Sequence, residues 1–208
     1  MKAVYVVRIN NYFPELCEIT IPLIKNYAKK IGADFVEITE RKFPDFPPTY
    51  EKLQIYELGK NNDWNILSDA DNLIHPNAVD LTAYLKPDHI GYFSGFDANN
   101  MFEMDKYFMR DGRNLGMATG WVMSSNLTHD LWTPLEFGWE EARKRTKREF
   151  IIDEYCLSRN LAKFGLKFTG LNFSKAIWNQ FPHLGVEEET DRKAIVEKAK
   201  NIVKEWKI

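Results

Sequence analysis

Two aspartates one residue apart follow a short apolar segment in the stretch WNILSDADNLIHPNA, residues 64–78. Residues 64–68 have the pattern of a strand, so Asp69 and Asp71 lie at its carboxyl end, where open α/β sheets bind ligands. Alternation along an extended chain directs both carboxylates to one side. Adjacent anions repel each other unless a cation lies between them, so the pair predicts a Mg²⁺ or Mn²⁺ ion. Such an ion usually completes its shell with water and phosphates, which predicts a phosphate-bearing substrate.

Three other interpretations of this stretch compete with a metal site. A calcium loop needs an oxygen ligand and a turn-forming glycine where Leu73 and Ile74 stand. A phosphatase with an aspartyl nucleophile usually carries its acid pair after the first strand of the chain, whereas Asp69 follows the third expected strand. The third interpretation is an aspartate-rich turn whose acids only cap a helix. The residues of this stretch alone leave that third interpretation open.

Segments with strand and helix patterns alternate along the chain around the acid pair. Strand patterns occupy residues 3–9, 33–38, 64–68, 89–96, 117–125 and 166–171. Helix patterns occupy residues 14–31, 50–59, 76–85, 127–147 with an interruption near Pro134, 149–165 and 187–206. Because this alternation builds parallel sheets, we predict an α/β fold with a mixed, mostly parallel central sheet flanked by helices. No linker-like segment divides the sequence, so we expect residues 1–208 to form a single domain.

The composition excludes several classes of protein. A formal net charge of -2 provides no basic field for a phosphate backbone, so we expect no nucleic-acid partner. The two cysteines follow no metal-ligand spacing and are too few for a disulfide scaffold, which indicates a reducing compartment. The apolar run near the N-terminus is too short for a signal peptide or a transmembrane segment. We therefore expect a cytoplasmic protein without a transmembrane segment.

The stretches PPTYEKLQIYEL, from Pro47, and DWNILSDADNLIHPNA, from Asp63, resemble the GT-A glycosyltransferases, specifically the glycogenin-like and galactosyltransferase-like group. In that group a helix precedes a strand that ends in an Asp-x-Asp motif, which Asp69 and Asp71 match. The resemblance implies a GT-A (Rossmann-like) nucleotide-sugar-binding domain that transfers a hexosyl or deoxyhexosyl group from a UDP-sugar to a hydroxyl of a glycan or another acceptor, with retention of configuration. The chain also resembles one domain of a multidomain glycosyltransferase from a large virus such as a chlorella virus, which implies the host cytoplasm.

The resemblance also implies which residues bind the metal and the donor. His183 becomes the third metal ligand beside Asp69 and Asp71, and an imidazole among the ligands favours Mn²⁺ over Mg²⁺. The end of the first strand, with Val6, Val7, Arg8 and Asn10, is expected to contact uracil and ribose. Lys52 matches a basic position near the donor phosphates, and the alternative is that it is a solvated helix lysine. Arg8 departs from the small residue usual there. Gly185 comes one residue early after His183, and the expected Lys-Pro-Trp is missing, which leaves the phosphate contact without its usual residues.

The sugar side of the implied site lies in two later segments. The strand MATGWVMSSN, residues 117–126, resembles the one that borders the donor sugar, so Thr119 and Gly120 are expected in the sugar pocket. Asp153 and Glu154 resemble the helix-start acids that face donor and acceptor, and they are the candidate catalytic residues. An anion near the anomeric carbon and a base for the acceptor hydroxyl are what glycosyl transfer requires. Asp97 is a further candidate for holding sugar hydroxyls.

Several alternatives remain at this stage. Trp121 and Trp178 either stack on a sugar or belong to the core. The loops at residues 40–50 and 96–114 are expected to select the sugar and the acceptor. A module that binds nucleotide-sugars or glycans without turnover shares the same fold, and the Asp69, Asp71, His183 set argues against it. A nucleotidyltransferase is a second alternative. Such an enzyme would have a loop rich in glycine and basic residues after the first strand, and the segment RINNYFPE at that position is not such a loop.

Overall fold

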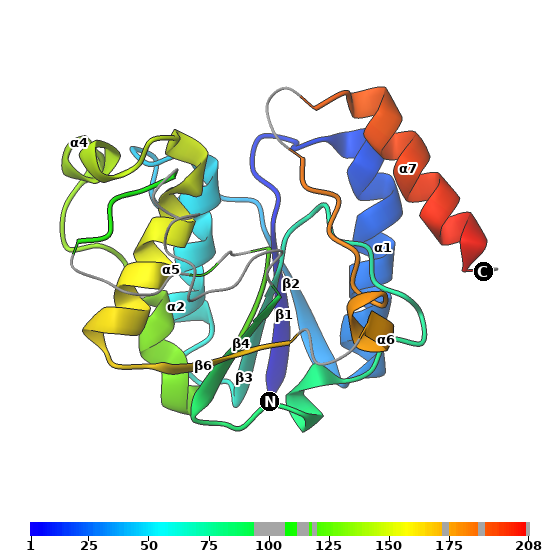
Figure 1. Ribbon diagram of the computed structural model, residues 1–208, viewed down its shortest axis with the longest axis horizontal. Coiled ribbons are helices and arrows are strands. Elements are labelled where there is room, and N and C mark those ends of the chain that lie inside the picture. The colour runs from blue at the N-terminus through cyan, green and yellow to red at the C-terminus, as the bar shows by residue number, and fades with distance from the viewer. Residues whose placement is uncertain (94–106, 112–116, 118–119, 172–174, 187–189, 207–208) are drawn as a thin grey trace.

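The computed structural model describes residues 1–93, 107–111, 117, 120–171, 175–186 and 190–206. Its centre is a sheet of six strands, β1 (Lys2–Val7), β2 (Ala33–Ile38), β3 (Trp64–Ser68), β4 (His89–Phe93), β5 (Trp121–Ser125) and β6 (Lys167–Gly170), in the order β2-β1-β3-β5-β4-β6 (Figure 1). Only β5 runs against its neighbours, and the pairs β1–β2, β1–β3 and β4–β6 are parallel. The predicted mixed, mostly parallel sheet is confirmed.

Helices cover both faces of the sheet. The longer ones are α1 (Pro14–Lys30), α5 (Ile152–Lys163) and α7 (Arg192–Glu205), and short ones are α2 (Ile55–Leu58), α4 (Trp139–Ala142) and α6 (Lys175–Trp178). In Figure 1, α1 and α7 lie side by side on one face, and α2 and α5 lie on the other. None of the helices in the described residues is long and apolar enough to cross a membrane.

The alternation of side chains along the strands explains the two layers. In β1, Val4 and Val6 pack into the core beneath α1, whereas Ala3 and Tyr5 pack into the core beneath α5. Successive side chains of a strand point to opposite faces, so a strand that is apolar throughout needs cover on both. The near-continuous apolar sequence of β1 therefore specifies a central strand with helices on either side.

Helix α1 has the bounds that its sequence signals predict. Pro14 occupies the first turn, where the backbone N–H has no partner within the helix and its absence costs nothing. Lys29 and Lys30 lie in the last turn, where their positive charges interact favourably with the negative end of the helix dipole. Gly32 follows with a φ of 67°, a left-handed conformation that glycine adopts without strain. The helix thus begins beside the carboxyl end of β1 and carries the chain back to the start of β2.

Two predicted helices are corrected by the structure. Residues 76–85 do not form a helix; the only helical turn there is the 3₁₀ segment Leu81–Ala83. The backbone N–H of Val79 donates to the side chain of Gln180 (2.9 Å) instead of to a preceding carbonyl, so a tertiary contact replaces the helical hydrogen bond. The predicted helix 127–147 consists of Asn126–Trp132, α4 and Arg143–Arg145. The predicted interruption near Pro134 is confirmed, but it is longer than expected and includes Gly138.

Candidate active site

The turn that carries the two aspartates is fixed by hydrogen bonds to other elements. Asp69 directly follows β3, and its N–H donates to the carbonyl of Gly120 (2.9 Å), which directly precedes β5. The Thr20 hydroxyl on α1 donates to the carbonyl of Ala70 (2.6 Å). Because the backbone on both sides of Ala70 is held, Asp69 and Asp71 are presented in one arrangement before any ligand binds.

A late segment of the chain brings His183 to Asp71. Residues 180–186 run antiparallel to residues 71–75, with Leu73 N–H donating to the carbonyl of Pro182 (2.8 Å) and Leu184 N–H to that of Asp71 (3.2 Å). This pairing places His183 Nε2 3.2 Å from Asp71 Oδ1. One ligand atom from each of Asp69, Asp71 and His183 lies within 4.8 Å of the other two. The pairing therefore brings His183 to the two predicted metal ligands Asp69 and Asp71, which lie more than a hundred residues earlier in the sequence.

Gly120 leaves room for the His183 ring. A Cβ added at Gly120 would lie 3.1 Å from His183 Cε1 and 3.3 Å from Nδ1, closer than an ordinary carbon contact. The resemblance places Gly120 in the sugar pocket, but in the structure Gly120 does not line the cavity and lies against the imidazole instead. The missing side chain of this glycine therefore gives the His183 ring its place next to β5.

The protonation of the three groups shows how strongly they interact. Burial disfavours a charged His183, but the hydrogen bond to Asp71 and the charges of Asp71 and Asp69 outweigh it and raise the pKa of His183 to about 9. Burial also raises the pKa of Asp71, yet the His183 hydrogen bond and the Val186 N–H (2.9 Å) hold that pKa below its usual value. For Asp69, burial and the charge of Asp71 outweigh Lys52 and raise the pKa. A proton on His183 thus partly compensates the two acids.

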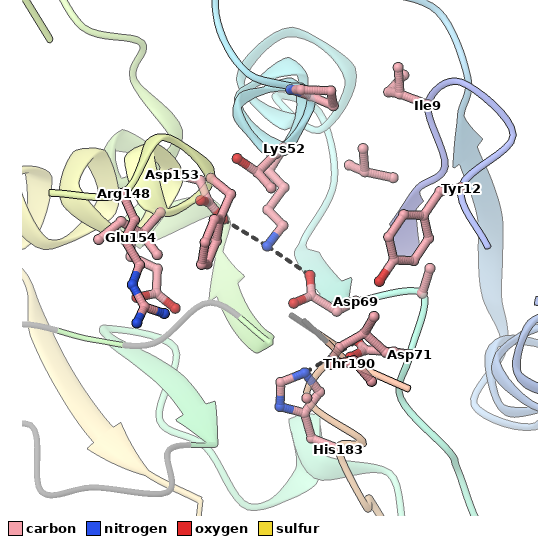
Figure 2. A pocket seen from close by; sticks show the side chains of 18 of the residues that line it. Ile9, Tyr12, Lys52, Asp69, Asp71, Arg148, Asp153, Glu154, His183 and Thr190 are labelled. Carbon is pink, nitrogen blue, oxygen red and sulfur yellow. Dashed lines mark hydrogen bonds and ion pairs between the residues drawn. The ribbon is translucent and has the colours of Figure 1, made fainter. Parts of the chain in front are cut away.

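A buried ion pair lies beside the predicted metal ligands. Lys52 Nζ is 2.7 Å from Asp69 Oδ1 and 2.7 Å from Asp153 Oδ2 (Figure 2). The side chains of Lys52 and Asp153 are only 7% and 2% exposed. Burial disfavours the ammonium, but the two carboxylates outweigh it and raise the pKa of Lys52. Lys52 therefore stays charged and joins the Asp-x-Asp turn to the start of α5.

These groups line one cavity of about 480 Å³. Its walls come from the loop after β1, the 3₁₀ segment Pro48–Gln54, the Asp-x-Asp turn, the start of α5 and the segment that leads into α7. The predicted site residues that line it are Val7, Lys52, Asp69, Asp71, Asp153, Glu154 and His183. In Figure 2, Ile9 and Tyr12 lie on one side of the cavity and Arg148 and Glu154 on the other. The volume suits a ligand of the size of a small cofactor.

Other predicted residues lie elsewhere. Arg8 does not line the cavity; its Nε donates to the Glu37 carboxylate on β2. Asn10 has an exposed side chain in a left-handed backbone (φ 55°) and is also absent from the lining. Thr119 and Asp97 lie outside the described residues.

Of the two candidate tryptophans, Trp121 lies in the core and Trp178 packs against it, partly buried. Trp121 is 2% exposed and packs against Phe181 with ring centroids 5.0 Å apart. Trp178 contacts Phe93 edge-on at 5.5 Å. Neither tryptophan lines the cavity, so the alternative in which they belong to the core holds.

The loop at residues 40–50 is ordered around one buried carboxylate. Glu51 is fully buried and accepts hydrogen bonds from Arg41 Nε (2.7 Å), Phe43 N–H (3.0 Å) and Gln54 Nε2 (2.7 Å). A buried charge is tolerated when several donors satisfy it. This anchor holds the loop that leads to Thr49 at the cavity wall.

Sequence reasoning missed two cationic residues of the wall, Arg148 and Arg192. Arg148 is placed by a short antiparallel pairing in which Lys147 N–H donates to the carbonyl of Tyr107 (2.6 Å). Its guanidinium lies 5.6 Å from the Tyr107 ring centroid. Arg192 begins α7. Neither residue belongs to a motif, because the contacts that bring them to the cavity are between segments far apart in the sequence.

Comparison with known proteins establishes the fold of this chain through structural similarity and not through sequence similarity. No protein-family model and no curated protein matches the sequence. Among solved structures, a glycosyltransferase involved in glycosylation of the major capsid of PBCV-1 matches with a TM-score of 0.57 and 11% identity, over 96% of this chain and 98% of that one. The galactosyltransferase LgtC, in complex with donor and acceptor sugar analogs, matches with a TM-score of 0.54 and 13% identity, over 97% and 96% of the two chains.

A third structure extends the same comparison. The glycosyltransferase GlyE of Streptococcus pneumoniae TIGR4 matches with a TM-score of 0.51 and 14% identity, over 98% of this chain and 62% of that one. The chain thus spans nearly all of two of these structures and about three fifths of the third. At these identities the comparison establishes the fold, and the fold of this chain is the GT-A, Rossmann-like fold of glycosyltransferases, as the resemblance predicted.

Proposed function

We propose that this chain, as one domain, is a metal-dependent glycosyltransferase that moves a sugar from a UDP-sugar to a hydroxyl group of a glycan or another acceptor. The observation that carries the proposal is the Asp69, Asp71, His183 cluster at the wall of a cavity of about 480 Å³, at the ligand-binding edge of a GT-A sheet. The three solved structures compared above are glycosyltransferases, one of them in complex with donor and acceptor sugar analogs.

The donor atoms of the cluster suit a divalent ion. Two carboxylates and an imidazole are ligands that Mn²⁺ accepts readily, and Mg²⁺ is the alternative for the carboxylates. The space beside Gly120 accommodates the imidazole, and the Val186 N–H orients the Asp71 carboxylate. When bound, the ion supplies Lewis-acid neutralisation of the charge on a diphosphate leaving group.

Lys52 and Asp153 act beside the metal ligands. The ion pair of 2.7 Å holds the Asp153 carboxylate at a fixed place in the cavity wall. An anion at that place stabilises the positive charge that develops on the sugar ring in an oxocarbenium-like transition state. Lys52 positions both Asp69 and Asp153, so it orients the metal side and the sugar side of the cavity relative to each other.

Glu154 lies on the side of the cavity opposite Tyr12 (Figure 2). We propose that this side admits the acceptor and that Glu154 takes the proton of the attacking hydroxyl. We also propose that the linkage retains the configuration of the donor, since retention is typical of the group that the Asp-x-Asp region resembles. The anomeric coupling constant of the product in an NMR spectrum distinguishes retention from inversion.

The proposal is tested by incubating the protein with UDP-sugars in the presence and absence of Mn²⁺ and measuring UDP release and transfer to added glycans. We expect metal-dependent UDP release that Asp153→Asn lowers strongly while an exposed control, Glu57→Gln, leaves it unchanged. Metal-dependent binding of a nucleotide-sugar without any turnover would identify a binding module instead. Release of pyrophosphate from a nucleoside triphosphate would identify a nucleotidyltransferase.

A further inference from the structure

Arg192, the first residue of α7, places a cation at the cavity wall beside the metal ligands. It lines the cavity together with Thr190, and the segment that precedes it contributes His183, Gly185 and Val186 to the same wall. Residues 183–186 therefore supply a predicted metal ligand to the same cavity wall to which Arg192 supplies a guanidinium.

The guanidinium of Arg192 is oriented by an aromatic ring. Its Cζ lies 4.8 Å from the centroid of Phe13, a ring that is 2% exposed and packed between α1 and α7. The face of an aromatic ring attracts a cation, and the flat guanidinium keeps its N–H groups free to donate in its own plane. Within the part of the chain that the structure describes, no carboxylate forms an ion pair with Arg192. Stacking thus holds the group in place, and because Arg192 is exposed its donors are available to a ligand.

The cavity is lined by more acidic side chains than lysine and arginine side chains, so an anionic ligand would be repelled unless a cation lies near it. Four carboxylates line the cavity, those of Asp69, Asp71, Asp153 and Glu154. Lys52 is engaged by two of them, and Arg148 lies on the same side of the cavity as Glu154 (Figure 2). An anionic ligand therefore needs a further cation besides the metal, and a guanidinium fits two phosphate oxygens at once.

The helix end itself does not provide this anion site. The carboxylate of Asp191 caps α7 by accepting from Lys193 N–H (3.0 Å) and Ala194 N–H (3.2 Å). Those backbone donors are therefore unavailable to a ligand, and a negative group stands at the helix start. Attraction of an anion at this wall depends on the side chain of Arg192.

We propose that Arg192 binds the diphosphate of the nucleotide-sugar donor, on the side of that group away from Lys52. This inference rests on the proposed function for the identity of the ligand. It assigns the phosphate contact to α7, a helix whose first turn is fixed over α1 by the Phe13 contact. Arg192 discriminates a nucleoside diphosphate from a nucleoside and has no part in recognising the base.

The test measures affinities by isothermal titration calorimetry with Mn²⁺ for UDP, uridine and inorganic pyrophosphate. For Arg192→Gln we expect the affinity for UDP and for pyrophosphate to fall about tenfold or more, since hydrogen bonds to charged groups are the strong ones, while uridine affinity is unchanged. Arg192→Lys retains part of the affinity. The matched control is Lys193→Gln, which removes the same charge one residue further along α7 at a position that does not line the cavity; it leaves all three affinities unchanged.

Each outcome decides between the two proposals. UDP binding that is equal in the wild-type protein and Arg192→Gln overturns the assignment of Arg192 and leaves the proposed function intact. An equal loss in Arg192→Gln and Lys193→Gln shows a diffuse charge effect and also overturns the assignment. Pyrophosphate binding that depends on Arg192 without any UDP binding supports the anion site and contradicts the proposed donor, and absence of all binding contradicts both.

Discussion

Two clusters of charge lie side by side in this cavity, and they differ in exposure to water. In the cluster of predicted metal ligands Asp71 is 7% exposed but its partner His183 is 43% exposed, whereas Lys52 and Asp153 in the other cluster are both buried, at 7% and 2%. Exposed ligands exchange a proton for a metal readily, but a buried ion pair is held by the cost of leaving any member alone. We therefore expect the His183 side, which we propose to bind the metal, to bind and release ligands, and the Lys52 side to serve as a fixed frame.

The largest effect is expected from breaking the buried side. Lys52→Met leaves the carboxylates of Asp69 and Asp153 without their shared cation, which we expect to lower the free energy of unfolding by about 3–5 kcal/mol. Urea denaturation measures it. The control is Lys60→Met, whose pairing with Glu57 is exposed (60% and 63%) and should change stability by less than about 1 kcal/mol. Equal small effects would show that the buried pair is not a structural frame.

The next effect concerns the metal side. Asp71→Asn removes a carboxylate that His183 and Val186 orient, and we expect UDP release in Mn²⁺ to fall more than about 100-fold, because mutation of outer partners alone costs about 10–100-fold. Steady-state kinetics over a range of Mn²⁺ concentrations measures it. Unchanged kinetics in this variant would contradict a catalytic metal. The melting temperature should move far less than in Lys52→Met, which sharpens the contrast between the two clusters.

The exposed side should also respond to pH. The pKa of His183 is about 9, so at pH 6 to 8 the metal-free protein carries a proton that must leave when the imidazole binds a metal. Mn²⁺ affinity should therefore rise about tenfold per pH unit in this range and level off above pH 9. Calorimetric titration at several pH values measures the slope. His183→Asn binds more weakly and should show a flatter dependence, and an equal slope in both proteins would assign the proton elsewhere.

The smallest effect tests the space around the imidazole. Gly120→Ala brings a Cβ to 3.1 Å from His183 Cε1, so the ring must move and Mn²⁺ affinity should fall about tenfold. Gly138→Ala is the matched control, because its added Cβ meets nothing within 4 Å. Calorimetry with Mn²⁺ compares the two variants. A loss that is the same in both would point to backbone stiffening and not to the ring.

Local patterns predicted the parts of the fold that depend on local physics. The strands at residues 33–38 and 64–68 have the predicted bounds, because β-rich sequence between turn signals specifies them. The helix predicted at residues 76–85 was wrong, since the chain there satisfies Val79 N–H with Gln180, about a hundred residues away. The helix propensity of a segment does not decide its structure where a residue distant in the sequence provides a better hydrogen bond.

The residues of the candidate site likewise differ in how far the sequence alone predicts them. Asp69 and Asp71 follow from spacing after a strand, and His183 and Asp153 followed only from resemblance to a family. Their approach to the aspartates is produced by the pairing of residues 71–75 with 180–186 and by the Lys52 bridge. Arg192 carries no motif and was not predicted at all.

Residue types and spacing were sufficient to specify an α/β sheet with an acid pair at a ligand-binding edge. The sequence shows which charged residues are present but not which of them form ion pairs, and from the sequence Lys52 could equally be solvated or contact a phosphate. In the folded protein Lys52 pairs with the Asp69 and Asp153 carboxylates, because a buried ammonium is stable only where anions surround it. The same packing placed the His183 imidazole over Gly120 and the Arg192 guanidinium over Phe13, contacts that depend on distances between segments remote in the chain.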